Sequence, residues 1–222
     1  MNLAAPRNVR CIVAITHLEV DNEALDSGAG LTPEEIERLS NLSEPCEGID
    51  LENLLEAINQ RLADSQKRNE RLMERIEQAA EHSILLFANS VLHTEEMAAR
   101  LNLRGIPAAA VSGTTPTVTR RYFLERFQRG EIRVLCNHTV LSTGFDAPRT
   151  DMALISRAVF SPVRYMQMVG RGLHGEKNGG TVSCRIVTVV DNLGRFRNRH
   201  PYYYCAEYFR ALESATTQAV SP

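Results

Sequence analysis

The chain has 222 residues, a formal charge of −2 at pH 7, and 43% hydrophobic and 23% charged residues, which is the balance of a globular protein. No apolar run approaches the roughly 18 residues that a membrane-spanning helix needs. The first residues, MNLAAPRNVR, lack the charged start and the apolar stretch of a secretory signal. No membrane partner is expected, and the sequence predicts a cytoplasmic protein.

Five cysteines are scattered along the chain without a CxxC pair, which predicts reduced thiols. Cys136 and His138 are close enough in sequence to share a metal ion. Alternation along a strand is the preferred interpretation, because no second ligand pair lies nearby. No zinc or other metal site is predicted.

The small net charge hides an uneven distribution of charged side chains. Residues 1–81 hold 8 basic and 17 acidic side chains, a net charge of −9. Residues 82–200 hold 16 basic and 8 acidic side chains, a net charge of +8. Such asymmetry indicates an anionic partner for the basic part, and phosphate is the obvious candidate.

The first half of the chain begins with a predicted strand at 9–16, which is short, β-branched and apolar. A polar, glycine-bearing loop is expected at 21–30. A short helix should then begin at Thr32, the N-cap, and run to about Leu42, with Glu35 closing a capping box.

A long helical pattern follows from 50 to about 80. Its polar middle, 64–69, leaves open whether it is one helix or two. Beyond residue 81 the pattern changes to short apolar strands that alternate with helices, which predicts an α/β fold in which a parallel sheet has helices on both faces. Strands are expected at 83–88, 106–111, 132–136, 152–156 and 184–190, and helices at 94–103, 117–129 and 162–173.

Small polar residues and glycines follow four of the predicted strands. In open α/β sheets ligands bind beyond the carboxyl ends of the strands, and hydroxyls, amides and backbone N–H groups are suited to holding phosphates. The residues concerned are Asn89 and Ser90, Ser112 to Thr115, Asn137 to Thr139 with 141–146 after them, and Arg157.

The helix at 162–173 is expected to enter through Ser161 and Pro162 and to be two-sided. An apolar face should pack on the sheet, and a polar face should point outward, with Gly170 letting a backbone or a phosphate approach. A merely solvated helix face is an equal alternative. The apolar residues are Val163, Met166, Val169 and Leu173, and the polar ones are Arg164, Gln167, Arg171 and His174.

A phosphate-binding loop is missing from the sequence. It contains no GxxxxGK[S/T] pattern and no strand followed by GxGxxG. The glycine-rich stretch 175–180 follows a helix rather than opening one, which is typical of a turn. The chain is therefore not expected to hold a triphosphate and its magnesium by itself.

Residues 83–195 resemble the C-terminal RecA-like lobe of superfamily 2 helicases, in the style of bacterial DEAD/DEAH-type helicases related to restriction-enzyme motor subunits. The resemblance rests on the order and spacing of four segments. These are ILLFANSVLHTEEMAARL (84–101) for motif IV, VSGTTPTVTRRYFLERFQRGEIRVLCN (111–137) for motif IVa, VLSTGFDAP (140–148) for motif V and YMQMVGRGLHG (165–175) for motif VI.

This resemblance implies two RecA-like lobes, with ATP and Mg²⁺ in the cleft between them and nucleic acid, DNA rather than RNA, bound across both. The catalytic set would be Gln167, Arg171 and His174, with Arg171 as an arginine finger on the γ-phosphate. Gly144, Asp146 and Gly170 would contact the nucleotide. Ser90, Ser112, Gly113, Thr114 and Thr143 would line the nucleic-acid track.

One position departs from the motif. His174 stands where motif VI usually carries a second arginine, and histidine is shorter and mostly neutral at pH 7. Either Arg171 carries the finger role alone, or catalysis is weakened, or a neighbouring arginine substitutes.

The expected organisation is an N-terminal junction segment (1–50), a helical segment packing on the lobe (51–81), the RecA-like lobe (82–200) and a C-terminal tail (201–222). The leading hypothesis is a motor lobe that needs an N-terminal RecA-like lobe, absent from this chain, to hydrolyse ATP. One alternative is a non-catalytic nucleic-acid-binding or regulatory module derived from such a lobe. A nucleotide-binding protein without a nucleic-acid role is disfavoured by the charge distribution.

Overall fold

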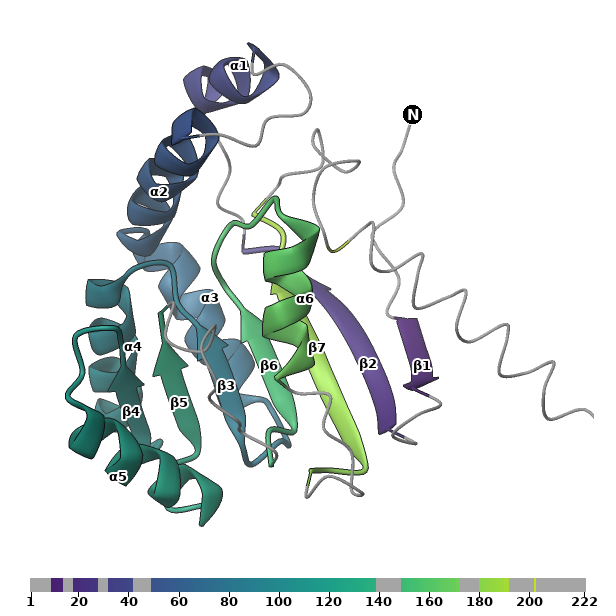
Figure 1. The fold of residues 1–222 in the computed structure, drawn as a ribbon, viewed down its shortest axis with the longest axis vertical. Coiled ribbons are helices and arrows are strands. Elements are labelled where there is room, and N and C mark those ends of the chain that lie inside the picture. Colours follow the sequence, from purple (N-terminus) through teal and green to yellow (C-terminus); the bar gives the residue numbers. More distant parts are fainter. Residues whose placement is uncertain are drawn as a thin grey trace, which may run out of the picture.

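The computed structural model describes residues 9–13, 18–27, 32–41, 49–138, 149–171, 180–191 and 202. These residues contain a seven-stranded sheet of order β1-β2-β7-β6-β3-β5-β4 (Figure 1). β1 is antiparallel to β2, and the other pairs are parallel. The strands are β1 Val9–Val13, β2 Leu18–Leu25, β3 Ile84–Phe87, β4 Ala108–Val111, β5 Val134–Asn137, β6 Met152–Ile155 and β7 Ser183–Val189.

Helices cover both faces of this sheet, which confirms the predicted α/β class. α3 and α4 share one hydrophobic cluster with the sheet, and α5 and α6 share another on the opposite face. β3, β5 and β6 are buried along their whole length because both of their faces are covered. The helices are α1 Pro33–Asn41, α2 Ile49–Ala63, α3 Gln66–Glu77, α4 Val91–Leu103, α5 Thr117–Gln128 and α6 Pro162–Gly170.

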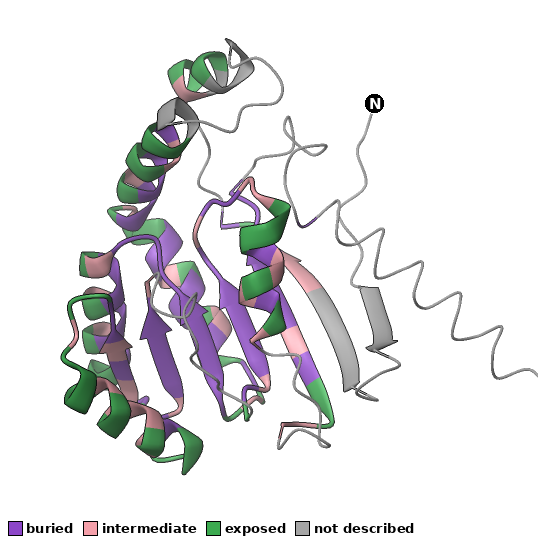
Figure 2. Cartoon of the chain, in the orientation of Figure 1, coloured by how far each residue is buried: buried purple, intermediate pink, exposed green. Residues whose placement is uncertain are grey.

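The long helical pattern consists of two helices, α2 and α3, which answers the question left open by the sequence. Asn69 reaches back from α3, and its side-chain amide donates to the carbonyl of Ala63 at 2.7 Å, at the end of α2. α2 extends beyond the sheet, and its described residues form a buried stripe on one side and an exposed face on the other (Figure 2). None of the described helices is long and apolar enough to cross a membrane.

The predicted capping box at the start of α1 is confirmed. The backbone N–H of Thr32 donates to Glu35 Oε2 at 2.7 Å, and the N–H of Glu35 donates to Thr32 Oγ1 at 3.2 Å. The same carboxylate accepts from Arg61 Nε at 2.6 Å. The cap of α1 therefore also ties that helix to α2.

The prediction of a polar loop at 21–30 is wrong for residues 21–25, which belong to β2. This strand lies beside β7 in a parallel register that runs from Glu19 opposite Ser183 to Leu25 opposite Val189. Its polar residues concealed it, because strands depleted of apolar residues resemble loops in sequence. Leu25 nevertheless lies in the cluster with α3, and Ala24 packs on the other face.

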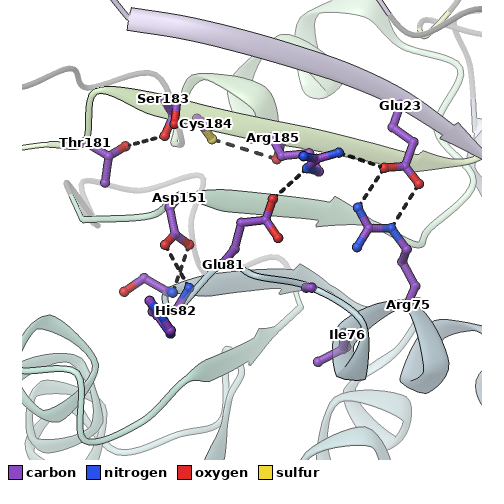
Figure 3. A network of polar contacts seen from close by, with 12 residues as sticks. Glu23, Arg75, Ile76, Glu81, His82, Asp151, Thr181, Ser183, Cys184 and Arg185 are labelled. Atoms are coloured by element: carbon purple, nitrogen blue, oxygen red, sulfur yellow. Dashed lines mark hydrogen bonds and ion pairs between the residues drawn. The ribbon is translucent and has the colours of Figure 1, made fainter.

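Partners from outside the strand bind the carboxylate of Glu23 in β2 (Figure 3). Glu23 accepts from Arg75 of α3 at 2.9 and 2.7 Å, and Arg185 of β7 lies 3.5 Å away. Burial opposes ionisation, but the bonds and charges of Arg75 and Arg185 outweigh it and lower the pKa of Glu23. Arg185 also pairs with Glu81 at 2.6 Å, so this network joins α3 to β7 and to the entry of β3.

Candidate functional site

The polar residues that follow β4, β5, β3 and β6 lie at one edge of the sheet. The register pairs Val111 with Asn137, Phe87 with Asn137, and Phe87 with Ile155, so these four strands end level with one another. The segments that begin at Ser112, His138, Ala88 and Ser156 therefore emerge side by side. The expected gathering is confirmed for the described residues, while Thr139 and residues 141–146 lie outside them.

The loop after β4 is closed by its own hydroxyl groups. Ser112 is buried, its N–H donates to Thr115 Oγ1 at 2.9 Å, and its hydroxyl lies 2.8 Å from Thr114 Oγ1. Arg120 of α5 donates to the carbonyls of Ser112 and Thr115 at 3.3 and 3.2 Å. Gly113 and Thr114 are exposed at the tip of this ordered loop. A Cβ atom at Gly113 would meet nothing within 4 Å, so the backbone there is open to a ligand.

Ser90, at the end of β3, acts as the N-cap of α4. It is buried, and its hydroxyl accepts from the N–H of His93 at 3.1 Å. His93 Nδ1 accepts from the N–H of Asn89 at 3.1 Å, and Nε2 lies 3.0 Å from Asn69 Oδ1. The position of Ser90 at the edge agrees with the prediction, and its hydroxyl is engaged within the protein.

A buried polar network, which no motif in the sequence predicts, lies beneath this edge. The guanidinium of Arg68, on α3, donates to both carboxylate oxygens of Asp191 at 2.8 and 2.9 Å and to Asn89 Oδ1 at 3.0 Å. Ser156 donates to the same Asn89 oxygen at 2.6 Å. The network holds the ends of β3, β6 and β7 against α3. A lone arginine in a helical pattern gave no signal of this role.

The amide of Asn59 extends the network to α2. Its Oδ1 accepts from the N–H of Ala158 at 2.8 Å and from Asn89 Nδ2 at 2.9 Å. Its Nδ2 donates to the carbonyls of Ala158 and Leu55 at 3.1 and 2.8 Å. All four hydrogen-bonding sites of this buried amide are thus used.

Arg157 places positive charge at the same edge, and His138 lies near it. Burial is the main cause that lowers the pKa of Arg157, the charge of Arg164 adds to it, and the charge of Glu56 opposes it. Burial also lowers the pKa of His138, followed by the charge of Arg157. Arg157 follows a predicted strand, and no role for it could be predicted from the sequence.

Helix α6 has an open outer face, although its buried face differs from the one expected. Tyr165 and Val169 are buried, and the Tyr165 hydroxyl lies 2.9 Å from Thr188 Oγ1 on β7. Val163 was expected to pack on the sheet and is instead 66% exposed. The aromatic ring of Tyr165 and its hydroxyl bond turn the helix so that Val163 points outward. The predicted entry is confirmed, since the Ser161 hydroxyl accepts from the N–H of Arg164 and a proline follows it.

Gln167 and Gly170 lie on this outer face, and Arg171 follows as the C-cap of α6. A Cβ atom at Gly170 would meet nothing within 4 Å, so a large group can approach the backbone there. The N–H of Arg171 donates to the carbonyl of Met168 at 3.2 Å, and its side chain is partly buried. These three residues form a group separate from the strand-end loops, because α6 runs back along the sheet (Figure 1).

Four predicted site residues, Thr143, Gly144, Asp146 and His174, lie outside the described residues. Within the described part of the chain, no group of three or more His, Cys, Asp or Glu residues could hold a metal ion. Cys136 is fully buried on β5, and burial raises the pKa of its thiol far above its ordinary value. That thiol is suited to packing rather than to metal binding.

The strand ends at the candidate site, Arg68 and Asn89 of the buried network, and the open α6 face lie within one segment that matches a known family. Residues 67–175 match the family model described as the helicase conserved C-terminal domain. The chain contains a helicase conserved C-terminal domain. Its parallel sheet with helices on both faces is that of the RecA-like C-terminal lobe of superfamily 2 helicases.

Two relatives of this helicase domain illustrate the likeness in sequence. The chain is 30% identical over 122 residues to a 51.5 kDa protein of a Lactococcus phage, covering 55% of this chain and 26% of that protein. It is 30% identical over 110 residues to a putative ATP-dependent helicase, IRC3, of Saccharomyces cerevisiae, covering 49% of this chain and 15% of that protein. The chain thus spans about a quarter or less of the length of these relatives.

The fold of the helicase domain is also found among solved structures. The C-terminal domain of the DEAD-box protein Dbp5 superposes with a TM-score of 0.52 at 18% identity, covering 64% of this chain and 81% of that domain. A further relative is named as the ATP-dependent RNA helicase DBP8 of Meyerozyma guilliermondii, at 31% identity over 101 residues, covering 46% of this chain and 23% of that protein.

Proposed function

We propose that this chain is the second motor lobe of an ATP-dependent nucleic-acid helicase or translocase. The observation that carries the proposal is the open outer face of α6, where Gln167, Gly170 and Arg171 stand in the segment matched to the helicase domain. An exposed glutamine, an unobstructed glycine and an arginine are the groups that a second lobe needs to contact a nucleotide held by a first lobe.

The residues of this face fit ATP as a shared ligand rather than as one held by this chain alone. Gln167 and Arg171 would approach the phosphates, and Arg171 would stabilise the negative charge that develops during phosphoryl transfer. Gly144 and Asp146 are proposed to couple the nucleotide to the nucleic acid, with His174 beside the finger. ATP with Mg²⁺ supplies the energy of phosphoryl transfer when bound. The sequence carries no phosphate-binding loop, so the triphosphate and Mg²⁺ would be held mainly by an N-terminal RecA-like lobe.

The nucleic-acid track is proposed to follow the strand-end loops. Gly113 and Thr114 are exposed on a loop whose shape is fixed by internal hydrogen bonds, which suits contact with a sugar–phosphate backbone. Ser90, Ser112 and Thr143 are proposed to line the same track. Two relatives carry RNA in their names, DBP8 and the DeaD helicase of Mycobacterium tuberculosis, so the expected preference for DNA is not supported. We propose nucleic acid as the substrate class and treat RNA as the first candidate.

The test is the ATPase activity of the longest native protein that contains this chain, measured with and without RNA and with and without DNA. We expect stimulation by one of the two, and a loss on the order of 10³-fold in an Arg171→Ala variant. An Arg71→Ala variant, which removes an exposed arginine on α3, is the matched control and should retain full activity.

The competing function is a nucleic-acid-binding module without motor activity. The missing phosphate-binding loop and His174 in place of the usual arginine favour it. Nucleic-acid binding without ATP hydrolysis under any condition would establish that function in place of the motor. Equal activity of the Arg171→Ala and Arg71→Ala variants would remove the arginine-finger role.

A further inference from the structure

Arg157 is the one partly buried arginine, in the part of the chain that the structure describes, that has neither a hydrogen bond nor a close ion pair. Its Nε atom is buried without a partner. The guanidinium of Arg133, by contrast, donates hydrogen bonds to three backbone carbonyls, including that of Ala79 at 2.6 Å. Burying a guanidinium N–H without a hydrogen-bond partner costs free energy. An arginine kept in that state indicates that a ligand completes its surroundings.

The backbone on both sides of Arg157 is fixed. Ser156, before it, donates its hydroxyl to Asn89 at 2.6 Å and accepts from Arg68 through its carbonyl. Ala158, after it, exchanges two hydrogen bonds with the amide of Asn59, at 2.8 and 3.1 Å. The buried network therefore holds the main chain of Arg157 in place at the carboxyl end of β6. Such support from surrounding residues is typical of a side chain that must meet a ligand in one geometry.

The electrostatic surroundings of Arg157 favour an anion. The charge of Arg164 acts at the same place and adds to the positive potential there. The opposing acid is Glu56, which is exposed on α2 and makes no close pair with Arg157 in the structure. Glu52, one turn before Glu56, pairs with Arg164. The acidic side chains of α2 thus reduce the positive potential at this edge but form no close ion pair with Arg157.

We propose that Arg157 binds a phosphate group at the carboxyl end of β6, beside His138. A guanidinium offers a planar fork of N–H donors that matches a phosphate, and the bond is charge-assisted. The phosphate belongs either to a nucleic-acid backbone or to a nucleotide, and the inference rests on the proposed function in placing such a ligand at this edge. Glu56 competes with the phosphate for the charge of Arg157.

The experiment measures binding to the 222-residue chain by fluorescence anisotropy. One arm uses labelled single-stranded RNA and DNA oligonucleotides over a series of NaCl concentrations, and the other uses a fluorescent ATP analogue with MgCl₂. Arg157→Gln should weaken one of these probes on the order of tenfold. If the phosphate is part of the nucleic-acid backbone, the slope of log K against log[NaCl] should also become shallower by about 0.7. If only the ATP analogue is weakened, the phosphate belongs to the nucleotide.

Three further variants make the result specific. Glu56→Gln should tighten the probe that Arg157→Gln weakens. Arg157→Lys should keep the salt slope and lose part of the affinity, because it keeps the charge without the fork. Arg38→Gln removes an exposed arginine on α1 and should change nothing.

A purely structural role of Arg157 is separated by thermal unfolding. Arg157→Gln removes an unpaired, partly desolvated charge, so its melting temperature should equal or exceed that of the wild type. A lower melting temperature with unchanged affinities would overturn the proposal. The proposal would also be overturned if Arg157→Gln bound a probe with the same affinity and salt slope as the wild type. The proposed function would stand in that case. If the wild type binds neither probe at low salt, the inference fails, while the proposed nucleotide contacts, which need an N-terminal lobe, are decided by the ATPase measurement on the longer protein.

Discussion

Arg68 and Asp191 form a bidentate ion pair in which neither side chain has any exposed surface. The two residues are 123 positions apart, one on α3 and the other just after β7. Asp191 has a φ of 41°, a left-handed conformation that is uncommon outside glycine and that asparagine and aspartate tolerate best. The pair fixes α3 to the strand ends from which Arg157 and the edge loops emerge.

Replacing Arg68 with alanine should lower the free energy of unfolding by about 3–5 kcal/mol, because the buried carboxylate of Asp191 would lose its only countercharge among the described residues and keep just the Ser27 hydroxyl as a donor. Urea denaturation measures the change. Arg71→Ala, three residues further along α3, is the control. Arg71 pairs only with exposed Glu74, so its loss should cost less than about 1 kcal/mol. Equal losses for the two variants would show that Arg68 does not hold the edge together.

His93 should make stability depend on pH. Burial, followed by the charges of Arg68, Arg100 and His138, lowers the pKa of His93 from 6.5 to about 3. The folded ring is therefore neutral, while the unfolded chain takes up the proton first as the pH falls. The stability that the neutral His93 ring contributes is therefore present above pH 6.5 and is lost progressively as the pH falls to about 3.

A His93→Gln variant tests this contribution, since glutamine can accept from the N–H of Asn89 and donate to Asn69. Between pH 6 and pH 4 the free energy of unfolding of the wild type should fall more steeply than that of the variant, by about 1.4 kcal/mol per pH unit. Urea denaturation at several pH values gives both slopes. Parallel curves would mean that His93 is already charged in the folded protein.

Gly113→Ala separates stability from binding. A Cβ atom there meets nothing within 4 Å, and the glycine does not need a positive φ. The substitution should therefore raise the free energy of unfolding by about 0.4–1 kcal/mol by restricting the unfolded chain. The affinity for an oligonucleotide should fall, because the methyl group occupies the space in which the backbone would meet a phosphate. Unchanged affinity in anisotropy measurements would remove Gly113 from the proposed track.

Ser90→Ala should cost about 1 kcal/mol of stability, because α4 loses the hydroxyl that accepts from the N–H of His93. Ser161→Ala, which removes the corresponding cap of α6, is the matched control and should cost no more. The cap of α6 is longer, at 3.4 Å, and more exposed. A larger loss of oligonucleotide affinity for Ser90→Ala than for Ser161→Ala would support the predicted contact of Ser90 with nucleic acid.

The elements that have a clear hydrophobic pattern or recognisable helix-capping residues could be predicted from the sequence. The apolar run of β3, the capping box of Thr32 and Glu35, and the Ser161 entry to α6 each depend on neighbouring residues alone. β2 could not be predicted in this way. Its Glu23 is stable in a strand only because Arg75 and Arg185 reach it from elsewhere in the chain.

In the candidate site, too, features set by local sequence could be predicted, and features set by distant partners could not. The gathering of polar residues at the strand ends followed from their positions after predicted strands, and the register confirms it. The network of Arg68 and Asn59 could not be foreseen, because it joins residues that are distant in sequence and carry no motif. The unpaired state of Arg157 is likewise visible only when the partners of the other arginines are known.

The position of β2 has a consequence for how the chain folds during synthesis. β2 pairs with β7, in a register that begins with Glu19 opposite Ser183, so the strand that emerges early must wait for one made 164 residues later. At about 5–20 residues per second the wait is on the order of 10–30 s on the ribosome. During that time β3, β4 and β5 find their pairing partners and β6 can pair with β3, while β1 and β2 have only each other. We therefore expect docking of the N-terminal hairpin to be the last step of folding, and chaperone demand to be greatest for nascent chains that end before β7.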